Sequence, residues 1–360
     1  MSLSAATIDA GGVNNPAATG ITVHDLTAAH AAQWDAFVNA CPKATFFHLA
    51  GWEQVIEQAF GHDTYYLFAE SGNEIRGVLP LVHIKSSLFG NALISTPFCV
   101  YGGVASEDEA VCQQLEDAAC KLAEELGVDY LELRNREARH PDWPTKQLYM
   151  TFRKTIESDQ EAIMLAIPRK QRAMVRKGIK AGLQGNFDDS IKDFYSAYSQ
   201  SVHNLGTPVF SRTYFECLRD VFGDKCDILT VTHNGELVSS VMNFYFRDEV
   251  LPYYAGGTPV ARQLKGHDFM YWELMRHSCE RGLKVFDFGR SKQGTGPFSF
   301  KKNWGFEPSQ LFYEYYLVKA KQMPDVSPLN PKYKLFINIW KRLPLSVTEV
   351  IGPLLARNLG

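Results

Sequence analysis

The sequence predicts an α/β (α+β) protein built from two copies of one unit, each a mixed sheet flanked by helices. Three observations support this fold class. The order of predicted elements in residues 45–135 recurs in residues 208–292, each copy contains a hairpin turn between two apolar strands, and each carries a glycine pair ahead of a helix and a buried strand. A chain of 360 residues, 45% of them hydrophobic, can fill two cores.

The elements of the two copies correspond one to one. Each copy begins with an aromatic-rich helix that ends in Phe-Gly, continues through a strand, a tight turn and further strands to the glycine pair, and closes with an amphipathic helix and a buried strand. The matched segments are residues 46–61 and 210–223 for the first helix, 65–69 and 228–232 for the first strand, Gly72-Asn73-Glu74 and Asn234-Gly235-Glu236 for the turn, Tyr101-Gly102-Gly103 and Tyr254-Ala255-Gly256-Gly257 for the glycine pair, 111–126 and 269–279 for the second helix, and 130–133 and 285–288 for the closing strand.

These units predict a division of the chain into domains. We expect a disordered leader at residues 1–20, a first domain at 21–155, a second domain at 156–322 that begins with a basic linker helix at 167–183, and a Pro-punctuated tail at 323–360. Residues 311–318 are strand-like, and the tail has two short amphipathic patterns, at 333–340 and 347–359. Trp340 beside Lys341 and Arg342 suits a helix at a membrane interface, although packing on the protein's own surface explains the pattern as well.

Composition narrows the class of protein. The formal net charge of −3 and a pI of about 6.4 give no overall attraction for nucleic acid, so that any polyanion site must be local. The seven cysteines are scattered and never spaced as CxxC, which favours a reduced compartment and neither zinc nor disulfides. No uninterrupted apolar run is long enough for a conventional spanning helix. We expect a cytoplasmic protein without a metal or DNA partner, with peripheral contact at the inner face of the membrane left open.

Only the second copy has a turn suited to a phosphate-bearing donor. Residues 259–268 bring Gln263, Lys265, Gly266 and His267 to a helix start, where unpaired backbone N–H groups and the helix dipole favour an anion. In the first copy, residues 104–109 carry carboxylates that would occupy this position and repel a phosphate. Asp268 stands where a smaller residue would suit close approach, and a capping turn without a ligand is the alternative interpretation.

Several segments of the second copy resemble a known family. The paired-glycine strand, Gln263-x-x-Gly266, Phe286-Asp287-Phe288-Gly289-Arg290-Ser291 and Phe300-Lys301-Lys302-x-Trp304-Gly305-Phe306 are similar to the FemAB family of the GNAT (N-acetyltransferase) acyltransferases. The run from Arg169 to Gly178 and the segment Asn204-Leu205-Gly206-Thr207-Pro208-Val209-Phe210-Ser211 resemble FemAB-like proteins associated with PEP-CTERM/exosortase and exopolysaccharide loci. The resemblance spans about residues 21–345 and is only architectural in the first copy.

This resemblance implies a tandem GNAT fold and an acyltransferase. The expected reaction moves an acyl or aminoacyl group, from CoA or from a charged tRNA, to an amine or hydroxyl of a cell-envelope or exopolysaccharide precursor, such as a glycan or a lipid-linked intermediate. The imperfect turn at Asp268 leaves the choice between CoA and tRNA open. The alternative belongs to another class of function: a degenerate, non-catalytic GNAT fold that docks on a membrane or nucleic acid through its basic helix and tail.

Acyl transfer needs a base, donors for the oxyanion and an acid for the leaving group. Asp287 alternates with two phenylalanines on its strand and is the candidate base or amine-orienting group, with an ion pair to Arg290 as the structural alternative. The backbone N–H groups of Gly256 and Gly257 are candidate oxyanion donors. Tyr254 is the candidate acid, unless it is a core aromatic residue.

The acceptor pocket is expected beside these residues. Residues 289–296 form a predicted glycine-rich loop whose Arg290, Ser291 and Thr295 suit a phosphate or a sugar, and a mobile surface loop is the alternative. The remaining candidates for substrate contact are His203, Asn204, Lys301 and Lys302.

The linker helix is strongly cationic. Six Lys and Arg residues and no acid lie between Arg169 and Lys180. Four of them lie along one face at helical spacing: Arg169, Arg172, Arg176 and Lys180. An apolar edge is expected beside them, made by Ile167, Val175, Ile179 and Leu183. The pattern indicates contact with tRNA phosphates, a lipid pyrophosphate or anionic membrane, with a merely solvated face as the alternative.

Overall fold

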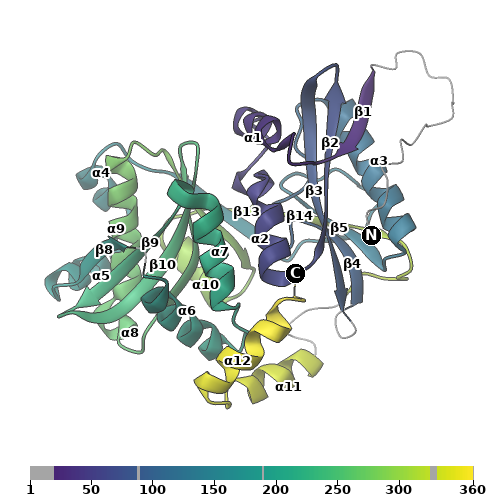
Figure 1. Ribbon diagram of the computed structural model, residues 1–360. Coiled ribbons are helices and arrows are strands. Elements are labelled where there is room, and N and C mark those ends of the chain that lie inside the picture. Colours follow the sequence, from purple (N-terminus) through teal and green to yellow (C-terminus); the bar gives the residue numbers. More distant parts are fainter. Residues whose placement is uncertain (1–19, 87–89, 189, 325–330, 360) are drawn as a thin grey trace.

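The computed structural model describes residues 20–86, 90–188, 190–324 and 331–359. It confirms the predicted fold class, because two seven-stranded mixed sheets, each flanked by helices, make up the molecule (Figure 1). The leader predicted at residues 1–20 lies outside the described residues but for its last one. Within the described residues, no helix is both long and apolar enough to span a bilayer.

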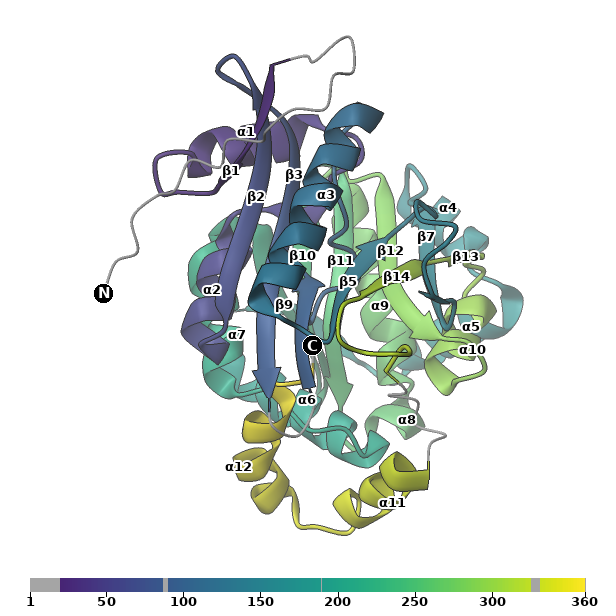
Figure 2. The ribbon, with the colours of Figure 1, turned by 90° about the vertical axis from the view of Figure 1, so that its right-hand side faces the viewer.

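The first sheet has the strand order β1-β2-β3-β4-β5-β14-β6. Its strands are β1 (Ile21–Asp25), β2 (Asp63–Ser71), β3 (Glu74–Ser86), β4 (Gly90–Ser95), β5 (Tyr130–Asn135), β14 (Phe312–Leu317) and β6 (Thr145–Lys146). The helices of this half are α1 (Ala31–Ala40), the short η1 (Phe46–His48), α2 (Gly51–Phe60) and α3 (Glu109–Leu126). Helix α3 packs across β2 and β3 on one face, as Figure 2 shows.

The second sheet has the order β13-β7-β12-β11-β10-β9-β8. Its strands are β8 (Gln184–Asp188), β9 (Cys226–His233), β10 (Glu236–Phe246), β11 (Glu249–Gly257), β12 (Val285–Lys292), β7 (Tyr149–Thr155) and β13 (Pro308–Gln310). Its helices are α4 (Gln160–Ala166), α5 (Arg169–Lys180), α6 (Ile191–Leu205), α7 (Arg212–Phe222), η2 (Gly223–Lys225), α8 (Ala261–Leu264), α9 (Gly266–Glu280) and α10 (Gly296–Asn303).

The two sheets repeat one topology. In both, a β-hairpin is followed by a strand that pairs in parallel with the last strand of the repeat, β4 with β5 and β11 with β12. The predicted turns are the hairpin turns, and Asn234 and Gly235 adopt the positive φ that such turns favour. One detail of the prediction is wrong. Gly102 and Gly103 follow β4 in a loop, where both N–H groups donate to the carbonyl oxygen of Arg134, instead of ending a strand.

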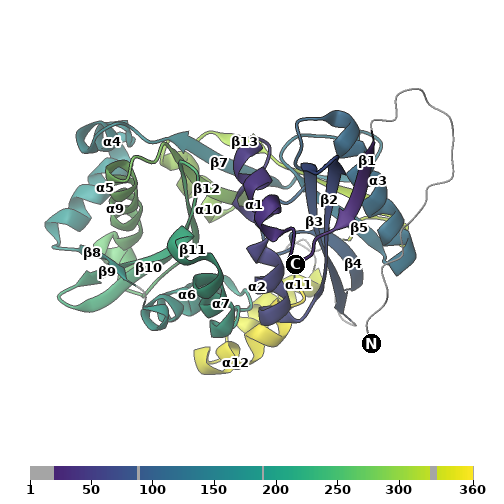
Figure 3. The same cartoon turned by 45° about the horizontal axis from the view of Figure 1, so that its top comes forward.

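The halves exchange one strand each, β7 and β14, and each of these is second from the edge of its sheet. β7 precedes the second repeat in the chain and pairs with β12 (Figure 3). β14 follows the second repeat and pairs with β5 of the first sheet (Figure 2). The sheets therefore cross the boundary expected at residue 155, since β7 lies before it and joins the second sheet, and β14 lies after it and joins the first. Each half needs a strand from beyond its own repeat, and this exchange ties the halves together.

An aromatic core continues from one half into the other. The rings of Phe46 and Phe244 are stacked with centroids 4.5 Å apart, and Phe46 also contacts Phe222 of α7. Gly51 allows α2 to approach α7, because a Cβ there would lie 2.8 Å from Val221. Burial of several large rings across one interface fixes the relative position of the halves.

His48 gives this core a dependence on pH. Its Nδ1 accepts from the backbone N–H of Thr45 at 3.1 Å, and its Nε2 donates to the carbonyl oxygen of Gly103 at 2.7 Å. The ring is 3% exposed. Burial lowers the pKa of His48 from 6.5 to about 4. Protonation of Nδ1 would in addition break the hydrogen bond from the N–H of Thr45.

We predict that His48 makes the fold acid-sensitive. The unfolded chain takes up this proton below pH 6.5 and the folded chain only near pH 4, so about 3 kcal/mol of stability should be lost across this window. Urea unfolding of the wild type and of His48→Gln at pH 7 and pH 4.5 measures the difference. A shallower loss in His48→Gln is expected, and equal losses would contradict the assignment.

The tail forms two helices, α11 (Pro331–Trp340) and α12 (Leu345–Ala356), which project together at one end of the molecule (Figure 1). Of the two interpretations of Trp340, the structure supports packing on the protein's own surface. Trp340 is 3% exposed and stacks on Phe336.

Candidate functional site

The two halves enclose a cavity of about 670 Å³, called here the interdomain pocket. One wall comes from the first sheet, through residues such as Ile94, Tyr130 and Glu132. The opposite wall comes from β12 and the start of α10, and the chain end contributes Asn358 and Leu359. A pocket built by both repeats is where a two-substrate reaction can bring its partners together.

The interdomain pocket carries an excess of positive charge. Arg290, Lys292 and Lys146 line it, and the described residues place no carboxylate within ion-pair distance of any of them. The guanidinium carbon of Arg290 lies 4.7 Å from the ring centroid of Tyr149, and Nη1 donates to the hydroxyl of Tyr313 at 2.6 Å. The one acid of the lining, Glu132, already accepts from Arg134 at 2.8 Å and from Tyr315 at 2.6 Å. The pocket is therefore suited to an anion.

A bulge in β12 aims these groups. Opposite β7, Asp287 pairs with Arg153 and Arg290 pairs with Thr151, so β12 has one residue more than its partner. Gly289 takes up this residue with a φ of +62°. The segment after Gly289 consequently continues as strand up to Lys292, followed by a short turn and α10, and differs from the loop predicted at residues 289–296.

Ser291 offers an unused hydroxyl to this pocket. Its side chain is 6% exposed, its Oγ has no partner, and it lies in the lining. Thr295 also lines the pocket, but its hydroxyl donates to the carbonyl oxygen of Lys292 and accepts from the N–H of Phe298. The hydroxyl of Ser291 is therefore available to bond a ligand in the pocket.

Lys301 lies behind the pocket and supports Arg290. Its Nζ donates to the carbonyl oxygens of Phe288, Gly289 and Arg290 at 2.6, 3.1 and 3.0 Å. Burial lowers the pKa of Lys301 to about 7, whereas three acceptors around Nζ favour the ammonium form. Lys301 thus holds the bulge, whereas the exposed Lys302 lies over the ring of Phe298 and away from the lining.

Tyr149 is a pocket residue that the sequence analysis missed. It lines the cavity at the start of β7, with its ring beside Arg290 and with the Lys292 Nζ 5.7 Å from its centroid. Burial raises the pKa of its hydroxyl, but Arg290, Lys292 and Lys146 outweigh burial and the net shift is downward. A phenol of lowered pKa can exchange a proton with a reacting group.

Asp287 does not face the pocket as predicted. It is 1% exposed, accepts from the N–H of Gly289 at 2.7 Å and from the hydroxyl of Tyr101 at 3.0 Å, and lies 3.5 Å from Arg153. Arg153 in turn pairs with Glu249. Arg290 is not the partner of Asp287. Because Tyr101 belongs to the first half, Asp287 acts as a structural link between the halves.

We predict that Asp287→Ala destabilises the fold by about 2–4 kcal/mol, since two buried donors lose their acceptor and Arg153 loses a counter-charge. Urea unfolding measures this, with Asp142→Ala, at an exposed position in the loop before β6, as the control. A stable Asp287→Ala variant without activity would instead support a catalytic base.

The predicted acid and oxyanion donors also lie elsewhere. The hydroxyl of Tyr254 bonds that of Tyr214 at 2.8 Å within the aromatic core. Gly257 donates its N–H to the hydroxyl of Ser201, and a Cβ on Gly256 would lie 2.2 Å from the carbonyl oxygen of Ala197. Gly256 thus allows α6 to pack on β11, whereas a Cβ on Gly257 would lie 2.9 Å from Ala261 of α8 and from His267 of α9. The lining of the interdomain pocket includes none of these residues.

The predicted donor turn is a helix start with little open space. Lys265 adopts a left-handed φ of +63° and its Nζ donates to the carbonyl oxygen of Arg262, while Gly266 is buried against Val238. Asp268 does not cap the helix; its carboxylate accepts from Trp304 at 3.1 Å. Gln263 and His267 are outside the interdomain pocket as well.

His203 and Asn204 lie in the last turn of α6. Neither ring nitrogen of His203 has a partner, and Asn204 accepts from Gln200. The pocket lining includes their neighbours Leu205 and Thr207 rather than these two residues.

The basic helix is confirmed as α5, which packs on α9. Gly178 permits this contact, because a Cβ there would lie 2.9 Å from Phe269. Arg172 donates to the carbonyl oxygens of Ile167 and Leu165 and so caps α4. The other cations of the helix are exposed and have no ion pair among the described residues: Arg169, Lys170, Arg176, Lys177 and Lys180. Of the apolar edge, Ile167, Val175 and Leu183 are buried, but Ile179 is 43% exposed.

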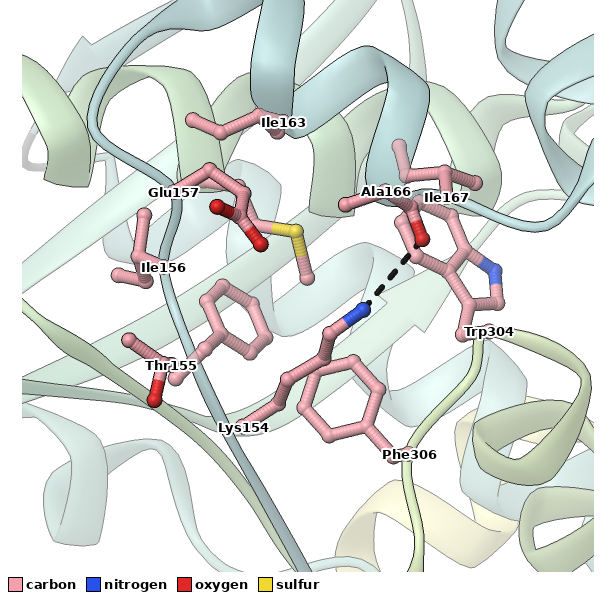
Figure 4. A pocket seen from close by; sticks show the side chains of 11 residues that line it. Lys154, Thr155, Ile156, Glu157, Ile163, Ala166, Ile167, Trp304 and Phe306 are labelled. Atoms are coloured by element: carbon pink, nitrogen blue, oxygen red, sulfur yellow. Dashed lines mark hydrogen bonds between the residues drawn. The ribbon is translucent and has the colours of Figure 1, made fainter.

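Two other cavities carry less chemistry. One lies beside α4, where Lys154 donates to the carbonyl oxygen of Ala166 at 3.4 Å among mostly apolar side chains (Figure 4); it has room for about 20 Å³. A second, of about 520 Å³, lies at the start of α3. Three of its four Lys and Arg residues pair with acids, Lys43 with Glu137 for example, whereas Arg136 lies over the ring of Tyr101. Asp108 caps α3 through the N–H of Ala110. The described residues contain no group of three or more His, Cys, Asp or Glu side chains placed to hold a metal ion.

Known proteins share this architecture. Residues 169–302 match the family model described as an acetyltransferase (GNAT) domain. No curated protein sequence matches the chain. The crystal structure of FemX is similar with a TM-score of 0.65, at 15% identity over 88% of this chain and 100% of that one.

Two further solved structures are similar. A conserved protein of unknown function from Bacteroides thetaiotaomicron has a TM-score of 0.57, at 11% identity, 82% of this chain and 99% of that one. The C-terminal domain of a proposed lysylphosphatidylglycerol synthetase from Agrobacterium fabrum has a TM-score of 0.55. Its identity is 13%, and the match covers 80% of this chain and 92% of that one. Identities this low show a shared fold alone. The chain thus has a GNAT-like fold in two halves, and its second half contains the segment that matches the GNAT acetyltransferase domain.

Proposed function

We propose that the chain is an acyltransferase and that its reaction takes place in the interdomain pocket. It moves an acyl or aminoacyl group from CoA or from a charged tRNA to an amine or hydroxyl of a phosphate-bearing envelope or exopolysaccharide precursor at the cytoplasmic face of the membrane. The observation that carries this proposal is Arg290, a cation without a carboxylate partner, in a pocket made by both halves of a GNAT-like fold.

The fold and the resemblances support the type of reaction and the class of acceptor. The acetyltransferase match covers the strand that carries Arg290. The resemblance to the branch associated with PEP-CTERM and exopolysaccharide loci favours an exopolysaccharide precursor. One protein of similar fold is, by its name, a synthetase of lysylphosphatidylglycerol, a phosphate-bearing lipid.

Each group of the pocket has a role in this proposal. Arg290 and Lys292 bind the phosphate, and the free hydroxyl of Ser291 adds a hydrogen bond. The acceptor amine or hydroxyl attacks the acyl carbonyl carbon, a new amide or ester bond forms, and the bond to the donor's sulfur or oxygen breaks. Tyr149 gives its proton to the leaving atom and regains one from the attacking group. Lys301 positions Arg290.

A thermal-shift screen tests the function. Acetyl-CoA, a charged tRNA and UDP-N-acetylglucosamine are each added to the wild type and to Arg290→Ala. A ligand at 100 times its dissociation constant stabilises the native state by about 2.7 kcal/mol, which raises Tm by several degrees. Stabilisation of the wild type alone, followed by detection of the acylated product by mass spectrometry, is the expected result. If donors stabilise both proteins equally, the pocket is not the site.

The unpaired cations of α5 favour a contact with a polyanion such as tRNA. We predict that replacing Lys170, Arg176, Lys177 and Lys180 together by alanine weakens tRNA binding and reduces the slope of log affinity against log salt by about three. Fluorescence anisotropy at several salt concentrations measures both. Arg172→Ala is the matched control, because Arg172 is engaged with α4 and should change stability more than binding. An unchanged slope would identify α5 as a solvated face.

A further inference from the structure

Exposed apolar side chains gather on the tail. Of the eleven large hydrophobic side chains that are exposed among the described residues, seven lie between residues 336 and 359. Four of them form one stripe on α12 at helical spacing, called here the α12 stripe: Val347, Val350, Ile351 and Leu354. Val350 is 71% and Leu354 64% exposed. Single exposed hydrophobic residues are ordinary on a protein surface, but a contiguous stripe marks an interaction site.

Helix α12 is oriented with its larger apolar side chains outward. The side that faces the body of the protein carries the small residues Thr348, Gly352 and Ala356, which are buried. Gly352 permits this contact, because a Cβ there would lie 2.8 Å from Val209. The charged residues of the helix hold it in place, since Glu349 accepts from Ser199 at 2.7 Å and Arg357 donates to the carbonyl oxygen of Phe60 at 2.6 Å. The stripe therefore cannot turn inward without loss of these contacts.

The surroundings of the α12 stripe are cationic. Residues 336–359 contain three Lys or Arg residues, Lys341, Arg342 and Arg357, and a single acid, Glu349, which is engaged with Ser199. Lys341 and Arg342 are exposed in the turn before α12 and have no ion pair among the described residues. Apolar side chains bordered by cations match the acyl and headgroup layers of a membrane that contains anionic lipid.

The stripe leads to the interdomain pocket. Leu354 lies one turn before Asn358 and Leu359, which line that pocket together with Leu205 at the end of α6. Leu205 is 59% and Leu359 38% exposed, so the pocket rim on this side is apolar. Arg290 lies in the same pocket. A lipid-linked phosphate whose apolar chain lies at this rim would therefore have its phosphate group within the pocket.

We propose that the α12 stripe docks on the surface of an anionic lipid bilayer and presents the interdomain pocket to lipid-linked phosphate substrates. The docking itself stands on the stripe, its orientation and its charge, and only the delivery of substrate rests on the proposed function. Insertion of the stripe buries Val350 and Leu354 in the acyl region, and Lys341 and Arg342 meet the phosphates.

Vesicle co-sedimentation of the full chain tests the docking. Vesicles of phosphatidylcholine alone are compared with vesicles that also contain phosphatidylglycerol, and binding to the anionic vesicles is expected. Val350→Glu with Leu354→Glu should reduce the partition coefficient by about 100-fold. Lys341→Glu with Arg342→Glu should abolish the preference for phosphatidylglycerol. The control is Leu165→Glu with Val260→Glu, which places two acids on exposed apolar positions elsewhere and should bind as the wild type does.

The outcomes separate the alternatives. Equal binding by the stripe variant and the control, or no binding of the wild type, overturns the proposal. Sedimentation velocity reports a second copy as the occupant: dimers of the wild type that dissociate in the stripe variant, without vesicle binding, also overturn it. Equal Tm values of all variants establish that they are folded. Because vesicle binding is read without donor or acceptor, and ligand binding at Arg290 without vesicles, failure of the docking and failure of the proposed function are distinguishable.

Discussion

Replacing Arg290 by alanine should weaken the binding of inorganic pyrophosphate about 100-fold, because hydrogen bonds to charged groups contribute about 1.5–3 kcal/mol and the guanidinium is the central cation of the interdomain pocket. Isothermal titration calorimetry at low salt measures the dissociation constant. The fold should tolerate the change. In the variant, Tyr313 loses its hydrogen bond from Arg290. Removal of the cation also relieves the electrostatic repulsion between Arg290 and the nearby Arg134.

Two further variants make this result specific. Arg290→Lys keeps the charge but loses the fork of N–H donors, so it should recover only part of the affinity. Arg262→Ala removes an exposed cation of α8 that is not in the lining and should bind pyrophosphate as the wild type does. If Arg262→Ala weakens binding as much as Arg290→Ala, pyrophosphate responds to the general charge of the surface and the pocket is not an anion site.

The fold could be predicted from the sequence because its signals are local. Hairpin turns such as Asn234-Gly235, the glycine that ends α3 and the apolar strands all act within a few residues, and each recurs in the second copy. The exchange of β7 and β14 could not be predicted. Pairing of a strand with a distant partner depends on the shape of the whole sheet, and an isolated apolar segment such as residues 312–317 does not indicate which sheet it joins.

The candidate site was predicted only in part, for a related reason. Arg290, Ser291 and Thr295 stand in a recognisable motif and do line the pocket. Alternation along the strand suggested that Asp287 faces the cleft, and Asp287 does point away from the core of Phe286 and Phe288. It is nevertheless enclosed, because Tyr101 of the first half covers it, and no local pattern reveals such a distant contact. Lys146 reaches the pocket from β6 and Tyr149 from the start of the exchanged strand β7. Both lie far from the second repeat in sequence, and no local pattern identifies them as pocket residues.

Loss of the hydroxyl in Tyr149→Phe should lower kcat about 100-fold or more while KM changes little, because general acid catalysis contributes about 10²–10⁴-fold and the ring itself, on which Arg290 rests, is retained. The donor found in the thermal-shift screen is the substrate for this assay. A tyrosine of lowered pKa that acts as an acid must be protonated, so the wild-type rate should fall at alkaline pH as Tyr149 ionises. The Phe variant should lack this alkaline limb.

A titration without any substrate tests the same electrostatic argument. Ultraviolet absorbance of tyrosinate, recorded as wild type minus Tyr149→Phe, should reveal one phenol that ionises below the usual pKa of about 10. In the Arg290→Ala background the same difference should move to higher pH, because the nearest cation no longer favours the phenolate. If the difference titrates at the usual pH in both backgrounds, the three cations do not act on Tyr149. The proton donor would then be another group of the pocket. Departure of the donor's sulfur or oxygen requires a group that can give up its proton near the place where Arg290 binds the phosphate.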